Sequence, residues 1–137
     1  MDTEGLLSPA SAQEAREWYD GVGPAAQEVV KETARAMAFD AAEYDERVTG
    51  EVIETARDAL FASLLEVTVG TREEYEDWRA DTDYEVVEIG NENVDNVVWH
   101  VPGFGDEAVA ATYQDERRAA VSTLRRQAFG RIYREVV

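Results

Sequence analysis

The chain of 137 residues contains no cysteine and a single histidine, His100. Disulfide bonds, thiolate nucleophiles, cysteine metal sites and histidine metal clusters are therefore excluded, and we expect no metal and no cofactor. No run approaches the ~20 apolar residues of a membrane span. The first residues also lack the basic and apolar segments of a signal peptide. These absences predict a cytoplasmic protein that makes no contact with a membrane.

Lysine is almost absent as well. Of 13 basic residues only Lys31 is a lysine, against 30 acidic residues and a net charge of −17. At molar salt the Debye length is only about 3 Å, so carboxylates repel one another over short distances and keep the surface hydrated. The composition favours a halophilic cytosol, and the alternative is an acidic protein that binds basic partners. A chain of this charge also repels phosphate, which disfavours nucleic acid as a partner.

Length and composition predict a single domain over residues 1–137, since 45% of the residues are apolar and can form one core. Residues typical of helix starts predict several separate helices in the first half of the chain. Ser8 and Ser11 are candidate caps of a helix to about residue 19, and Pro24 suits the start of a second. Asp40 opens a third helical region over about 41–67, with a break near Gly50 and Gly70 as C-cap. Thr71 and Glu74 then open a short helix over 71–80.

The hydrophobic pattern changes to a period of two after residue 83. Residues 84–89 and 94–101 predict two strands, and the turn residues between them predict an antiparallel hairpin. Val97, Trp99 and Val101 share one face of the second strand, which we expect to pack on a helix because two strands alone are marginal. A long final helix is expected from Asp106 to about residue 136. The predicted fold class is α+β and mostly helical, with four to five helices and one two-stranded antiparallel β-hairpin before the long C-terminal helix.

The last 21 residues reverse the charge of the chain, with six arginines and one acidic residue. A helical wheel places Arg117, Arg118 and Arg125 in or beside the apolar sector and turns Arg126, Arg131 and Arg134 elsewhere. The favoured interpretation makes these arginines internal counter-charges, with a carboxylate of residues 1–116 paired to Arg125. In the alternative, some of them hold a phosphate or carboxylate ligand. The candidate anion-binding residues are then His100, Tyr113, Arg117, Arg118 and Arg125. As a lone histidine on the less apolar strand face, His100 is expected to be dispensable for folding.

Three long phrases carry a resemblance: "GPAAQEVVKETARAMAFD", "YDERVTGEVIETARDALFASLLEVTVGTREEYEDW" and "ATYQDERRAAVSTLRRQAFGRIYREV". With them the chain resembles a family of uncharacterised proteins from halophilic archaea, classed as a domain of unknown function, along nearly its whole length. The resemblance implies a haloarchaeal cytosolic origin. It implies no activity and no catalytic residues.

Two functions remain open from the sequence. The first is a non-enzymatic binding or adaptor protein, with a protein partner or self-association. The alternative is an enzyme or ligand-binding protein acting on a small anionic or phosphorylated molecule near His100 and the C-terminal helix. A concave pocket lined by His100, Tyr113 and one of Arg117, Arg118 or Arg125 would favour the alternative. A closed surface there would favour the adaptor.

Overall fold

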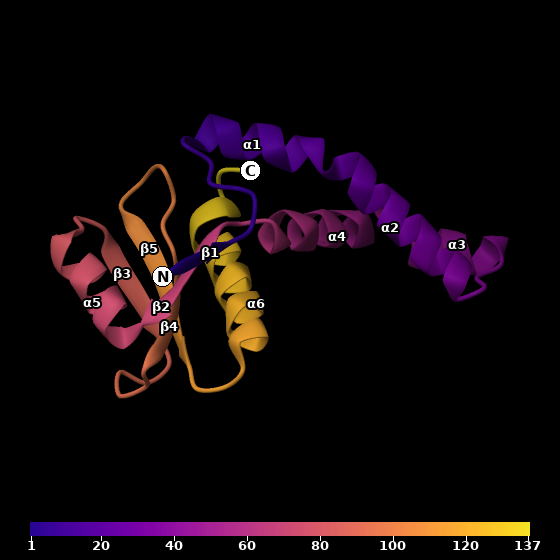
Figure 1. The fold of residues 1–137 in the computed structure, drawn as a ribbon. Coiled ribbons are helices and arrows are strands. Elements are labelled where there is room, and N and C mark those ends of the chain that lie inside the picture. The colour runs from indigo at the N-terminus through magenta and orange to yellow at the C-terminus, as the bar shows by residue number, and fades with distance from the viewer.

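A computed structural model describes all residues from 1 to 137 (Figure 1). Along the chain its elements are β1 (Asp2–Glu4), α1 (Ala12–Gly21), α2 (Gly23–Ala36), α3 (Ala41–Arg47), α4 (Gly50–Ser63), β2 (Val67–Thr71), α5 (Arg72–Asp81), β3 (Glu85–Ile89), β4 (Asn96–His100), β5 (Glu107–Tyr113), α6 (Arg117–Ala128) and the π-helical turn η1 (Phe129–Tyr133). The α+β class with mostly helical content is therefore confirmed. None of these helices is both long and apolar enough to cross a membrane.

The strands form one five-stranded mixed sheet in the order β1-β2-β4-β5-β3. Neighbouring strands are antiparallel except for β3 and β5, which are parallel, with Val87 opposite Val109. The predicted two-stranded hairpin is wrong, because β3 lies at the far edge of the sheet and β4 pairs with β2 and β5 instead. Turn residues between two strands indicate a reversal of the chain, but they do not determine which strands pair.

Strand β5 is the largest departure from the predicted elements, since residues 107–113 were expected to begin the final helix. The segment reads EAVAATY, and Ala108, Val109, Ala110 and Ala111 are all buried. A central strand that is covered on both faces loses the alternation of polar and apolar residues by which strands are recognised. The small alanines then read as helix formers, whereas in the fold they let two helices approach the sheet. The final helix begins only at Arg117.

Strand β2 replaces the predicted end of the third helical region, which was expected to reach about residue 67 with Gly70 as its C-cap. The helix of the third region ends at Ser63, and residues 67–71 pair with both β1 and β4. Gly70 is therefore a strand residue opposite Val97, and not a helix C-cap. A Cβ atom at Gly70 would lie 3.0 Å from the Trp99 ring, so glycine here makes room for the indole.

The local helix signals are largely confirmed. Ser11 accepts a hydrogen bond from the Glu14 amide at the start of α1, and Asp40 does the same for Glu43 at the start of α3. The predicted break near Gly50 separates α3 from α4, where Thr49 caps the new helix. The Ser8 cap is wrong, because α1 begins after Ser11. These signals act within one helical turn and need no tertiary contact.

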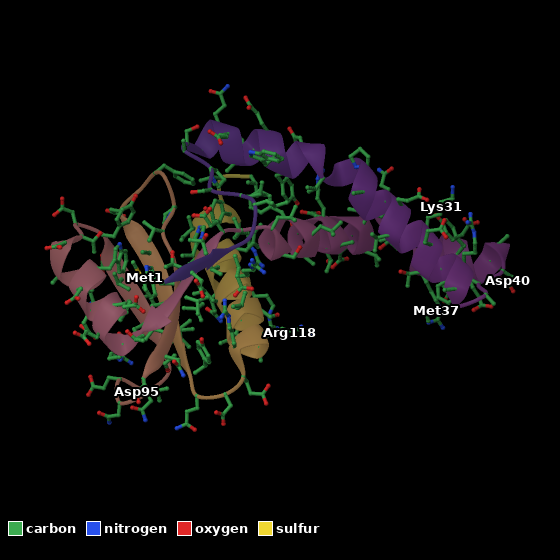
Figure 2. All side chains as sticks on the ribbon, in the orientation of Figure 1. Met1, Lys31, Met37, Asp40, Asp95 and Arg118 are labelled. Atoms are coloured by element: carbon green, nitrogen blue, oxygen red, sulfur yellow. The ribbon has the colours of Figure 1, made fainter.

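Helices cover both faces of the sheet (Figure 1). On one face, Tyr75 of α5 packs with Val97 and Trp99, which confirms the expectation that this strand face meets a helix. On the other face, Val121 and Leu124 of α6 pack with residues of β2, β4 and β5. A third cluster joins α1, α4 and the end of α6 around Phe61. Helices α2, α3 and the first part of α4 extend from this body as an arm, with Met37 and Asp40 at its far end (Figure 2).

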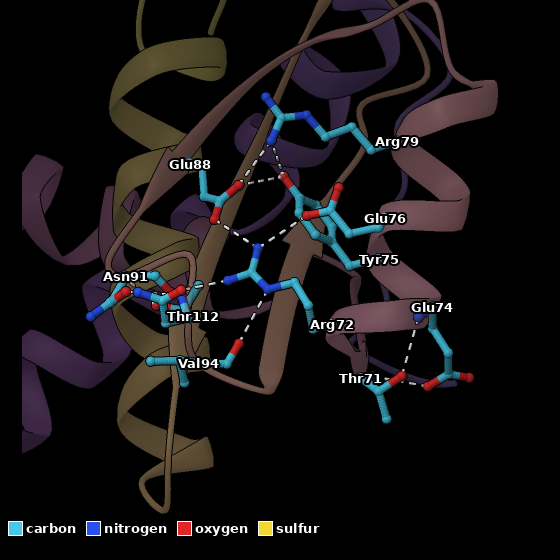
Figure 3. A network of polar contacts seen from close by, with 11 residues as sticks. Thr71, Arg72, Glu74, Tyr75, Glu76, Arg79, Glu88, Asn91, Val94 and Thr112 are labelled. Carbon is cyan, nitrogen blue, oxygen red and sulfur yellow. Dashed lines mark hydrogen bonds and ion pairs between the residues drawn. The ribbon is translucent and has the colours of Figure 1, made fainter.

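An ion-pair network fixes α5 against the edge strand β3 (Figure 3). The Glu88 carboxylate accepts hydrogen bonds from Arg72 and Arg79, each at 2.9 Å, and from the Tyr75 hydroxyl at 3.2 Å. Burial together with the Glu88 charge raises the pKa of Tyr75 to about 12. Thr71 and Glu74 form a complete capping box at the start of the same helix, as the sequence predicts. Because each charge here has a protein partner, the network is structural.

Candidate functional site

The most prominent concave feature is a groove beside the final helix, which we call the arginine groove. Its volume is about 720 Å³, within the range of about 300–1,000 Å³ that is typical of small-molecule sites. It is lined by Glu4 of β1, by Ala59, Ala62 and Ser63 of α4, and by Arg117, Arg118, Val121, Ser122, Arg125 and Arg126 of α6. Figure 2 shows Arg118 extending from α6 on the side toward which α4 projects. Four guanidinium groups therefore share one depression in a strongly acidic chain.

Arg125 does not have the carboxylate partner that was expected for it. Its Nε donates a hydrogen bond to the Leu65 carbonyl oxygen at 2.9 Å, and no carboxylate lies within ion-pair distance. Burial lowers the pKa of Arg125, which the Glu4 charge opposes. The expectation is wrong because the side of α6 that carries Arg125 packs on an apolar cluster of the sheet, in which no acidic side chain takes part. The acceptor that Arg125 meets is the Leu65 carbonyl oxygen, two residues after the end of α4.

The other groove arginines fall into two kinds. Arg117 is paired with Glu4, with 2.8 Å between Nη2 and Oε2. Arg118 and Arg126 make no hydrogen bond or ion pair with the protein, although they belong to a chain with 30 acidic residues. Outside the groove, Arg131 lies 3.6 Å from Glu107. The counter-charge interpretation therefore accounts for Arg117 and Arg131, and it leaves Arg118, Arg125 and Arg126 without a compensating carboxylate.

Small residues keep the groove open. Gly5 follows β1 with φ of +105°, and a Cβ atom there would lie 2.8 Å from the Arg125 guanidinium and 2.4 Å from the Leu65 oxygen. Only glycine adopts this conformation readily and allows β1 to approach so closely. On the opposite wall, Ala59 and Ala62 present methyl groups. Larger side chains at these three positions would fill the space that the arginines border.

His100 lies outside the groove and is 1% exposed. Its Nδ1 is 2.6 Å from the Glu66 carbonyl oxygen, and its Nε2 is 2.7 Å from the Tyr133 hydroxyl. A carbonyl only accepts, so the proton is on Nδ1 and the tyrosine donates to Nε2. Burial lowers the pKa of His100 and raises that of Tyr133. The histidine is a neutral core residue with both ring nitrogens hydrogen-bonded. The prediction that it is dispensable for folding assumed a less apolar strand face, and this assumption is wrong.

The structure thus divides the predicted site residues. Arg117, Arg118 and Arg125 line one groove, while His100 is buried elsewhere. Tyr113 ends β5 and is half-buried against the core cluster beneath α6, without lining the groove. Sequence reasoning missed Arg126, because only arginines in or beside the apolar sector were considered, whereas Arg126 lines the groove from an exposed position. A signal was present, because Arg118, Ser122 and Arg126 are spaced four apart and share one helix face.

Comparison with known proteins identifies the family. Residues 6–134 match the family described as "Family of unknown function (DUF5809)". The chain belongs to this family. No curated protein and no solved structure matches it. The DUF5809 description assigns no activity, so the chemistry of this family member is argued from the groove.

The groove of this DUF5809 protein is equipped to bind and orient an anion. Its charged groups are four arginines and Glu4, and its hydroxyls are those of Ser63 and Ser122. Guanidinium forks bind phosphate or carboxylate oxygens in pairs. Neither serine has a histidine in the groove that could take its proton. No group of three or more histidine, aspartate or glutamate side chains converges in a way that could hold a metal ion.

Proposed function

We propose that this DUF5809 protein is a non-enzymatic binding protein for a small phosphorylated or carboxylated molecule, which it holds in the arginine groove in a cytosol of high salt. One observation carries the proposal. Arg118, Arg125 and Arg126 border a single depression, and none of them is paired with a carboxylate. Elsewhere in the chain Arg35, Arg57, Arg72 and Arg79 have carboxylate partners, whereas Arg16, Arg47 and Arg134 have none but do not line this groove.

Electrostatics supports an anion as the missing partner. Like charges that share a groove repel one another, and a bound anion removes this repulsion while it gains charge-assisted hydrogen bonds. The α6 dipole adds partial positive charge near Arg117 and Arg118, which occupy its first turn. Arg125 is held by the Leu65 carbonyl, so its guanidinium is partly oriented before a ligand arrives. Such preorganisation reduces the entropy that binding costs.

The test is calorimetric titration with inorganic phosphate at one fixed KCl concentration, for the intact chain and two variants. We expect the double variant Arg118→Gln/Arg126→Gln to weaken phosphate binding at least about tenfold, since a charge-assisted bond contributes about 1.5–3 kcal/mol. Its melting temperature should stay close to that of the wild type, because both side chains are exposed. Arg47→Gln, an exposed arginine on the arm, is the matched control and should bind normally. Absence of phosphate binding by the wild type, or equal loss in both variants, contradicts the proposal.

The protein-adaptor alternative rests on a different surface. Val29, Met37 and Val52 lie on the arm and are 49%, 60% and 42% exposed. Contact with another copy of the chain would cover them. Sedimentation analysis over a hundredfold concentration range, for the wild type and for Val29→Asp, tests self-association. A wild-type monomer at every concentration counts against it.

A further inference from the structure

The groove-lining residues of α6 form two parallel rows. One row is Arg117, Val121 and Arg125, and the other is Arg118, Ser122 and Arg126. Within each row the residues are four apart, so they follow one another along the same helix face. Each row has an arginine at both ends and an uncharged residue in the middle. The four guanidinium groups are therefore two pairs, which start from helix positions eight residues apart.

The separation of these pairs follows from helix geometry. At about 1.5 Å per residue, eight residues span about 12 Å along the axis. This axial distance separates the helix positions from which the two pairs start. The α4 wall adds no charge between the pairs, because Ala59, Ala62 and Ser63 line it, and the one carboxylate of the groove, Glu4, is paired with Arg117. The α6 side of the groove is thus positive at its two ends and uncharged in its centre, where Val121 and Ser122 lie.

The two ends are also equipped in the same way. At one end Arg117 is anchored by Glu4 and Arg118 is free of protein partners. At the other end Arg125 is anchored by the Leu65 carbonyl, and Arg126 is free. An anchored arginine provides a fixed fork, while a free one can close over the bound group. Each end therefore has what is needed to hold one anionic group.

Carboxylates limit the basic stretch on both sides. Asp115 and Glu116 directly precede α6 and are exposed. Beyond Arg126 a second depression shares Ala59, Ala62 and Arg126 with the groove. This second depression is lined by three acidic residues of α4, namely Glu51, Glu54 and Asp58, and by one further arginine, Arg134, so its own charge is net negative. A polyanion longer than the groove would meet these carboxylates and be repelled.

Resting on the anion-binding function proposed above, we propose that the ligand is two-headed: a molecule of limited length with an anionic group at each end and an uncharged part between them. A bisphosphate, or a phosphate with a distant carboxylate, has this chemistry. Val121 and the two alanines contact the uncharged part, and Ser63 and Ser122 offer it hydroxyl groups. The alternating pattern of acidic, basic, neutral, basic and acidic segments selects such a molecule over nucleic acid, which requires a continuous basic surface.

The experiment uses matched probes on the full chain. Bisphosphates of linear alkane diols, with two to ten carbons, are compared by calorimetry with monoalkyl phosphates of the same length at fixed KCl concentration. We expect affinity for the bisphosphates to peak at an intermediate length. At that length it should exceed the affinity of the monophosphate at least about tenfold, because the second contact is intramolecular.

Two single variants test whether each end of the groove binds one phosphate group of the bisphosphate. Arg118→Gln and Arg126→Gln should each reduce the best bisphosphate to the affinity of a monophosphate, and Arg47→Gln should leave it unchanged. The melting temperature of every variant is measured first, so a loss of binding is not mistaken for a loss of fold. If bisphosphates bind no tighter than monophosphates at any length, the two-headed ligand is refuted, while arginine-dependent monophosphate binding still supports the proposed function. If neither kind of phosphate binds, both proposals are refuted.

Discussion

Acidification from pH 8 to pH 5.5 should remove stability that His100 contributes to this protein. His100 is the sole histidine, so it is the only side chain whose ordinary pKa, about 6.5, lies in this range. In the native state it is neutral and 1% exposed, and burial lowers its pKa. Below about pH 6.5 the unfolded chain therefore takes up a proton that the folded chain does not.

The sign and the size of the effect follow from linkage. Stability rises with pH wherever the unfolded state binds more protons, so the contribution of His100 is complete above about pH 6.5 and is lost as pH falls. The slope approaches about 1.4 kcal/mol per pH unit until the lowered folded-state pKa is reached. Protonation would also place a donor on Nε2 against the Tyr133 hydroxyl, which now donates to it. The tyrosine would then have to rotate its proton away within the core.

Urea unfolding followed by circular dichroism, at fixed KCl and at half-unit steps of pH, measures this slope. His100→Gln is the matched variant, since its amide can donate to Glu66 and accept from Tyr133 but does not titrate. We expect the variant to fold and to lose the slope between pH 7 and 5.5. His100→Ala strands two buried groups and leaves a void, so it should cost about 3–5 kcal/mol. A wild-type slope no steeper than that of the glutamine variant would refute the buried neutral histidine.

Four other perturbations have defined outcomes, the first three in the same urea assay and the fourth in thermal unfolding. Gly5→Ala should cost about 1–3 kcal/mol because of its positive φ and the nearby Leu65 oxygen, whereas Gly130→Ala, with nothing within 4 Å, should be neutral or stabilising. Glu88→Ala removes the acceptor shared by two arginines and a tyrosine, so a loss below about 1 kcal/mol would argue against the network. Tyr133→Phe should cost about 1–3 kcal/mol, because it strands a buried imidazole nitrogen. The melting temperature should rise from about 0.1 M to several molar KCl, and a flat or falling response would contradict the halophilic interpretation of the charge.

Several features of this protein were determined by neighbouring residues and could be predicted without a structure. Ser11, Asp40 and Thr71 cap helices because a side-chain oxygen meets an amide three residues later, whatever the rest of the chain does. The helix break near Gly50 and the position of Val97 and Trp99 on the same face of β4 also depend only on nearby residues. The concentration of arginine in the last 21 residues also pointed to the segment that borders the groove.

The pairing of strands and the location of charges were decided only by the tertiary structure. The sequence of β5 resembles a helix because burial on both faces removes the alternation of polar and apolar residues. Strand β3 pairs in parallel with β5, although β4 and two loops lie between them in the chain. His100 has no local signal for burial, since Glu66 and Tyr133 reach it from more than 30 residues away. The arginine groove likewise needs α4, β1 and α6 together. The helix starts and the strand faces follow from contacts within a few residues, and the number of arginines follows from composition alone, so all three could be predicted. Which arginines stay unpaired, and the groove that they line, depend on contacts between β1, α4 and α6. These segments are distant in the sequence, and only folding brings them together.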